Sequence, residues 1–111
     1  MPTLDELLLE KFKVRTRAVE NPKVTSLGTT ATLVLANNPN RLGWVIVNLS
    51  SNVIYLGFAN DVSSSKGVRL AANGGFASRI WDEDFHPTGW AVWGVASGAG
   101  SAIYSYEIIS Y

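Results

Sequence analysis

The sequence predicts an all-β protein, a jelly-roll-like sandwich or barrel of about eight antiparallel strands with a short N-terminal helix. Three observations favour this fold class. The apolar segments are short, and they are rich in β-branched and aromatic residues. Turn-forming residues separate them at intervals of about ten residues. No helical segments alternate with them, which argues against a parallel sheet.

Length, charge and composition limit the function. With 111 residues, the chain has the size of one domain. Nine basic and nine acidic side chains give zero formal charge, so we expect neither nucleic acid nor a membrane surface as a partner. No apolar stretch is long enough for a transmembrane helix, and we expect no secretion signal. Cysteine is absent, which excludes disulfide bonds and thiolate metal ligands.

We divide the chain into an N-terminal arm, residues 1–20, and a β-sandwich domain, residues 21–111. The arm begins with a short helix, from Thr3 to about Glu10. Thr3 and Glu6 have the spacing of a capping box, in which each side chain accepts from a first-turn amide. The leucines that share one helical face are Leu4, Leu7 and Leu8. A helix this short needs a surface to lie against.

Residues 11–18 predict the first strand, because basic side chains alternate with less polar ones. The basic side chains are Lys11, Lys13, Arg15 and Arg17, and the opposite face begins with Phe12. We favour the interpretation that this basic face is a solvated strand edge, protected from aggregation by its charge. The alternative is a basic stripe that docks on an acidic partner.

The remaining elements follow from turn signals and strand patterns. Asn21-Pro22 predicts a turn, residues 60–67 a polar loop and residues 82–88 an acidic loop. Further turns are expected at residues 37–40 and 73–75. The strands are expected at residues 31–36, 43–49, 52–58, 68–70, 76–81, 89–95 and 102–109.

The most informative stretch is residues 43–58, where two apolar runs flank the turn Ser50-Ser51 and predict a buried antiparallel hairpin. Residues 89–109 repeat this plan, which suggests a second hairpin in an equivalent place in a facing sheet. Both faces of each run of the first hairpin are apolar. We therefore expect a cover on both sides: the body of the domain on one, and a second sheet, the N-terminal segment or another subunit on the other.

Candidates for chemistry are weak. His86 is the single histidine, and we expect an ordinary loop residue. Asp82, Glu83 and Asp84 could bind a hard cation, but they lack the order of a calcium loop, so we favour solvated acids. Glu107 could face the acidic loop as a glycosidase pair, although nothing in the sequence places it there. We therefore predict no catalytic residue, no metal and no cofactor.

The four tryptophans allow a binding function. Trp44 and Trp90 begin strands and have the pattern of core residues. An exposed tryptophan would instead provide a platform for a sugar ring. Trp81, beside the acidic residues, is the best candidate for stacking on a glycan, and Trp90 is the second.

Residues 38–75 resemble a pattern in small β-rich structural proteins of tailed bacteriophages and related viruses. It consists of Asn-Pro-Asn-Arg, a strand, Asn-Leu, a turn, a strand with Tyr-x-Gly, a Ser-rich loop and Gly-x-x-Leu before a glycine turn. Here it runs from Asn38-Pro39-Asn40-Arg41 through Asn48-Leu49 and Tyr55-Leu56-Gly57 to Gly67-Val68-Arg69-Leu70. The resemblance implies a virion component such as a capsid decoration or fibre-base protein, and it supplies no catalytic residues.

We therefore expect a non-enzymatic virion protein that self-associates, with three-fold symmetry as the first expectation, and attaches to a capsid or tail protein. The arm would supply the contacts, through Leu4, Leu7, Leu8, Phe12, Lys13, Arg15 and Arg17. The alternative is a glycan-binding module for host attachment that uses Trp81 or Trp90.

Overall fold

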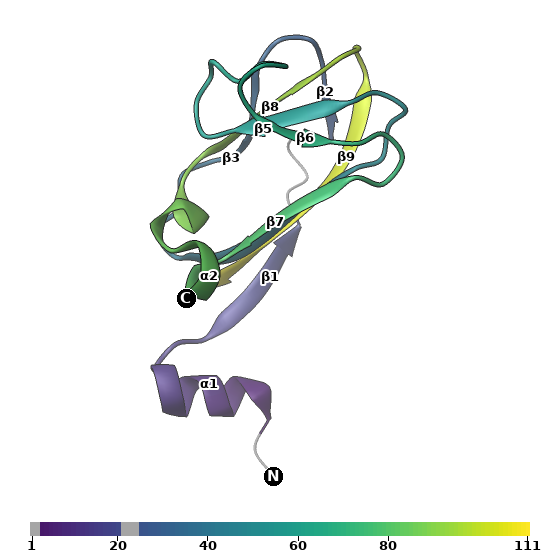
Figure 1. Ribbon diagram of the computed structural model, residues 1–111. Coiled ribbons are helices and arrows are strands. Elements are labelled where there is room, and N and C mark those ends of the chain that lie inside the picture. The colour runs from purple at the N-terminus through teal and green to yellow at the C-terminus, as the bar shows by residue number, and fades with distance from the viewer. Residues whose placement is uncertain (1–2, 21–24) are drawn as a thin grey trace.

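The chain folds into two antiparallel β-sheets packed face to face, with one helix beyond their end (Figure 1). The computed structural model describes residues 3–20 and 25–111. One sheet has the order β1-β9-β4-β7, and β2 also pairs with β9. It contains β1 (Thr16–Glu20), β2 (Ser26–Leu27), β4 (Arg41–Asn48), β7 (Phe76–Ile80) and β9 (Ser101–Ser110). The other sheet, in the order β3-β8-β5-β6, contains β3 (Thr32–Leu35), β5 (Ile54–Gly57), β6 (Val68–Leu70) and β8 (Val92–Ala96).

The connections between strands alternate between the two sheets. From β3 to β9, each strand except β6 lies in the other sheet from the strand before it. Such interlocked crossings are typical of a jelly roll. The predicted fold class is therefore confirmed in its sandwich form, because the two sheets do not close into a barrel.

Both predicted hairpins are wrong. β4 and β5 lie in different sheets, so the turn at Ser50-Ser51 is a crossover, and the same holds for β8 and β9. Instead, β4 pairs with β9 and β5 pairs with β8. The repeated pattern in the sequence reflects two crossover segments that pair with each other. A short polar turn between apolar strands looks the same in both arrangements.

The core lies between the sheets, where the inward-facing residues alternate with outward-facing ones along each strand. Each large aliphatic side chain buried in this way contributes about 1.5–3 kcal/mol. The core consists of Leu27, Val34, Leu35, Trp44, Ile46, Ile54, Leu56, Leu70, Ala77, Val92, Ala96 and Ile103. Trp44 thus has the core position predicted for it.

The helix is longer, and the first strand shorter, than predicted. α1 spans Leu4–Phe12, so Lys11 and Phe12 are helical, and β1 begins only at Thr16. Lys13 ends the helix in the left-handed conformation, where its amide donates to the carbonyl of Leu9. A helix of leucines and charged residues with a capped N-terminus therefore prevails over the alternation. Thr3 caps it as predicted, accepting a hydrogen bond from the amide of Glu6.

The segment predicted as an acidic loop is partly helical. α2 (Trp81–Asp84) follows β7 directly, so the strand predicted at residues 76–81 ends at Ile80. A 3-10 turn, η1 (His86–Gly89), follows, and the strand predicted at residues 89–95 begins only at Val92. The strands expected at residues 31–36 and 68–70 are confirmed as β3 and β6. The turn predicted at Asn21-Pro22 lies outside the described residues, and the division into arm and sandwich stays a prediction.

Candidate functional site

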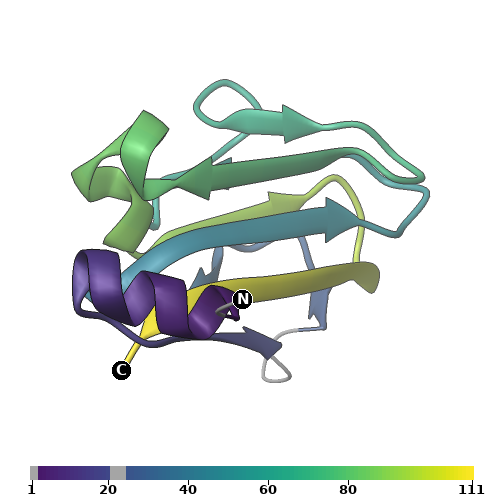
Figure 2. The ribbon, with the colours of Figure 1, turned by 90° about the horizontal axis from the view of Figure 1, so that it is seen from below.

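The N-terminal helix lies beyond the sandwich, at the end where α2 and the C-terminus lie (Figures 1 and 2). None of its residues is buried. Leu4, Leu7 and Phe12 are 70%, 45% and 55% exposed, whereas Leu8 is half-buried. The arm leucines predicted as partner contacts are therefore available to a partner.

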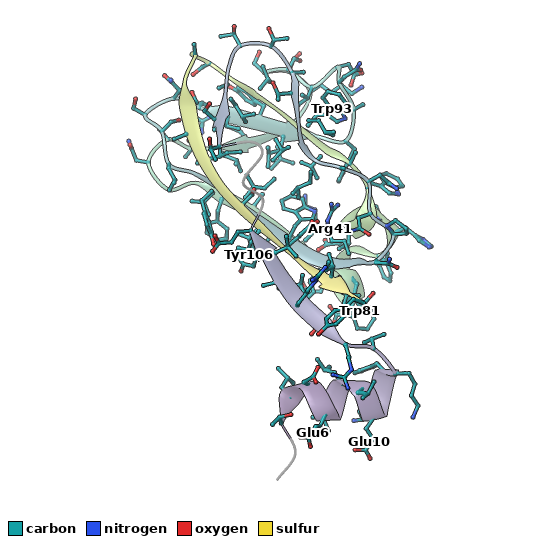
Figure 3. The ribbon with its side chains drawn as sticks, turned by 180° about the vertical axis from the view of Figure 1, so that it is seen from behind. Glu6, Glu10, Arg41, Trp81, Trp93 and Tyr106 are labelled. Carbon is teal, nitrogen blue, oxygen red and sulfur yellow. The ribbon has the colours of Figure 1, made fainter. Side chains whose placement is uncertain are left out.

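The acidic side of α1 faces away from the body. Glu6 and Glu10 point away from the sandwich in Figure 3. Because an α-helix turns once in 3.6 residues, Leu4, Leu8 and Phe12 form a stripe on the opposite side. This apolar stripe of α1 faces the end of the sandwich.

Two of the basic arm residues already have partners within the chain. Arg15 forms an ion pair with Asp5 at 3.4 Å, and both side chains are about half exposed. Arg17 lies 5.2 Å from the ring centre of Tyr111. Exposed pairs of this kind contribute little to stability. That Lys13, Arg15 and Arg17 meet an acidic surface stays a prediction.

The arm and the sandwich meet at two aromatic rings. Phe12 lies edge-on to Trp81, with 6.4 Å between the ring centres. Trp81 begins α2 and is 48% exposed. The best glycan-stacking candidate is thus exposed, as the sequence indicated, and it also contacts the arm.

Trp81 lines an open cleft of about 580 Å³ at this end of the sandwich, which we call the aromatic cleft. Trp90 is 48% exposed on its wall, so the core position predicted for this residue is wrong. The cleft brings together both tryptophans named from the sequence. Its lining is Asn37, Pro39, Arg41, Leu42, Trp81, Phe85, His86, Gly89 and Trp90.

Trp90 also separates the aromatic cleft from a second hollow of about 410 Å³. Its ring meets Phe58 edge-on, with 5.5 Å between the ring centres. Phe58 and Trp90 line this second hollow together with Val62 and Lys66. An edge-on aromatic contact of this kind orients both rings.

A buried ion pair lies at the aromatic cleft, where Arg41 is one of the lining residues. The guanidinium of Arg41, whose side chain is 1% exposed, donates to the carboxylate of Glu107. It also donates to the carbonyls of Trp90 at 3.1 Å and Ala36 at 2.6 Å. Through these bonds, Arg41 connects the segments that contain Ala36 and Trp90 to Glu107 in β9. This role of Arg41 was not predicted; the available signal in the sequence was a lone arginine immediately before the predicted apolar strand.

In the described part of the chain, the residues considered for chemistry are not joined to one another by hydrogen bonds. His86 lines the aromatic cleft, but no hydrogen bond joins it to Glu107, whose carboxylate is bound by Arg41. Asp84 accepts from the amide of Ile80 at 2.8 Å. Within residues 3–20 and 25–111, no group of acids and histidine has the arrangement of a metal site.

The outer face of the five-stranded sheet, which we call the β9 face, is a second exposed surface. The register of β4, β7 and β9 places apolar side chains from three strands on it, namely Val45, Val47, Phe76, Ile80, Tyr104, Tyr106 and Ile108. Figure 3 shows Tyr106 on this side of the molecule and Trp93 on the other. Among the strand residues that the structure describes, Glu20 is the single charged residue on this face, where it accepts from the Tyr104 hydroxyl at 3.1 Å.

The outer face of β4 is therefore apolar, as expected from the sequence, and α1 lies beyond the end of the β9 face, in front of the ends of β4 and β9 in Figure 2. No protein-family model matches this chain, and no curated protein or solved structure matches it. Among the described residues, no helix has the length and hydrophobicity to cross a membrane.

Proposed function

We propose that this chain is a non-enzymatic structural protein of a virion, which self-associates and attaches to the viral capsid or tail as a decoration or fibre-base protein. The observation that carries self-association is the β9 face. Seven apolar or aromatic side chains from β4, β7 and β9 share it, and Glu20, the one charged residue there among the described strand residues, is already hydrogen-bonded. Uncovered apolar surface of this kind marks an interface.

The virion part of the proposal rests on the resemblance of residues 38–75 to small phage structural proteins. The fold agrees with it, because jelly rolls are common in viral capsid proteins. Since the same fold also occurs in lectins, it does not decide between the two functions considered. Closed three-fold symmetry remains the first expectation for the assembly.

Sedimentation of the full chain at micromolar concentration tests self-association. We expect an oligomer, and we expect Phe76→Glu with Ile80→Glu to dissociate it. These residues are 67% and 46% exposed, so the fold tolerates the change. Leu33→Glu, at a 38% exposed position on the other sheet, is the matched control and should leave the oligomer intact. A wild-type protein that stays monomeric would contradict the proposed self-association.

Attachment to a particle has its own test. Mass spectrometry of purified particles should detect the chain at a fixed copy number relative to the major shell protein. Particles that lack the chain would contradict the virion assignment while leaving self-association standing.

Glycan binding is the second candidate function, because Trp81 and Trp90 line the same cleft and both are 48% exposed. Asn37 and His86 add polar groups to its lining. A glycan array should then identify a ligand, and Trp81→Ala should lose it. Tyr55→Ala, at a half-buried position on the four-stranded sheet, should keep it. An array without any binder would remove this candidate.

A further inference from the structure

We propose that helix α1 of one copy binds in the aromatic cleft of a second copy, so that neighbouring subunits exchange their arms. This inference rests on the proposed self-association and names the surface and the segment that carry part of it. The contact is heterologous, because a helix meets a cleft, and it closes into a ring under cyclic symmetry.

The helix requires a partner surface. α1 has nine residues and no buried side chain. Isolated helices shorter than about 12–15 residues are marginal in water, so packing must stabilise this one. Leu4, Leu8 and Phe12 provide one apolar stripe with a repeat of one turn, about 5.4 Å. Such a stripe is the kind of helix surface that binds in an apolar groove.

The aromatic cleft offers a matching groove. It is open, encloses about 580 Å³, and has apolar walls formed by Pro39, Leu42, Trp81, Phe85 and Trp90. Phe85 is 72% exposed there, and Trp81 and Trp90 are each 48% exposed. These rings would lose water contact when leucine side chains enter the cleft, which favours binding.

The charges beside the two rings are complementary. Lys11 and Lys13 flank Phe12, while Asp82 and Glu83 follow Trp81. Among the described residues, Asp82 and Glu83 form no ion pair, and the ion pair of α2 joins Asp84 to Arg79 at 4.0 Å. The contact of Phe12 with Trp81 brings these two short segments together within one chain. The same pair of segments can therefore form the contact between copies.

Within one chain this contact is incomplete. Its ring contact involves Phe12, at the C-terminal end of the helix, whereas Leu4 at the other end stays 70% exposed. β1 meanwhile stays paired along β9 from Thr16 to Glu20, which holds the base of the arm. A second copy is not subject to this tether, so its helix can place the whole stripe in the cleft. Exchange of an element between identical chains is a low-cost route to assembly.

Cross-linking between two variants tests the exchange directly, because the chain has no cysteine of its own. Phe12→Cys and Trp81→Cys chains are mixed and oxidised. We expect a covalent dimer that contains one chain of each kind. The control pairs Trp81→Cys with Ser97→Cys and should give no dimer, because Ser97 lies in the connection from β8 to β9, at the end of the sandwich opposite α2 (Figure 1).

A charge exchange provides a second readout that keeps both rings. Lys11→Glu with Lys13→Glu should weaken association about tenfold or more, and so should Asp82→Lys with Glu83→Lys. A mixture of these two variants restores the opposite charges across the contact and should recover much of the loss. Recovery distinguishes a direct contact from a general effect of net charge.

The outcomes separate this inference from the proposed function. No mixed covalent dimer, together with no recovery in the charge exchange, would overturn arm exchange even if the wild-type protein is an oligomer. A wild-type protein that stays monomeric would overturn both.

Discussion

The side-chain amide of Asn48 donates to the main-chain carbonyl of Asn52 at 2.7 Å, across the turn that connects β4 to β5. The same NH₂ group contacts the carbonyls of Leu70 at 3.3 Å and Ala71 at 3.1 Å. Its oxygen accepts from the amide and hydroxyl of Ser50, at 2.9 and 2.7 Å. One fully buried amide thus fastens the crossover between the sheets to the end of β6.

Replacement of Asn48 should therefore cost much stability. Asn48→Ala leaves buried carbonyls and the Ser50 amide without partners, for a loss of about 3 kcal/mol. Asn48→Asp should cost more, because its carboxylate would face the carbonyls of Leu70 and Ala71. Urea denaturation measures both, with the exposed Asn60→Ala as the control. An Asp variant as stable as the wild type would contradict this role.

Asn48 also shows why the sequence predicts the strands better than their pairing. The period-two pattern and the turn residues locate β3, β4, β5 and β6 to within a few residues. They do not encode which sheet a strand enters. Here that choice depends on side-chain bonds over long distances, such as those from Asn48 to the end of β6. A hairpin and a crossover remain equivalent in local sequence.

The candidate site was predictable in part. Leucines that share one face of a short helix indicate a partner, and two of them, Leu4 and Leu7, are exposed in the structure. Trp81 was identified because it adjoins acidic residues. The cleft itself was not predictable, since Arg41 and Glu107 are 66 positions apart in the sequence. Their pairing becomes evident only when β4 and β9 lie side by side.

Removal of one partner of the Arg41–Glu107 ion pair should strongly destabilise the protein. Arg41→Met leaves the carboxylate of Glu107, 15% exposed, without its cation, and we expect a loss of about 3–5 kcal/mol. The double variant Arg41→Met with Glu107→Leu should be more stable than the Arg41→Met single variant, because no unpaired charge remains. Chemical denaturation of both variants provides the comparison. Losses that simply add would contradict the direct coupling.

Gly75 should tolerate no side chain. A Cβ atom there would lie 2.4 Å from the main-chain nitrogen and oxygen of Ala71, and backbone atoms cannot move aside cheaply. Gly75→Ala, in the turn between β6 and β7, should therefore destabilise the protein by several kcal/mol. This loss is at least as large as that caused by overpacking a core site. Gly28→Ala is the matched control, since nothing lies within 4 Å of its Cβ position. Thermal unfolding should separate the two variants, and equal midpoints would contradict the argument.

The pKa of Asp61 should be lowered from its ordinary value of 3.8, first because Lys66 donates a hydrogen bond to its carboxylate and then because of the charge of Lys66. This lowered pKa stabilises the folded state at pH values above the ordinary pKa of Asp61. The contribution is lost as the pH falls through the pKa of the folded state. Lys66→Met should return the pKa of Asp61 toward 3.8, whereas Lys66→Arg should keep it low. Carbon-detected NMR titration of the Asp61 carboxyl group measures this. Lys66 and Asp61 form an ion pair, and both line the second hollow beside Trp90. If the pKa of Asp61 were unchanged in Lys66→Met, the ion pair would not hold the loop that contains these two residues.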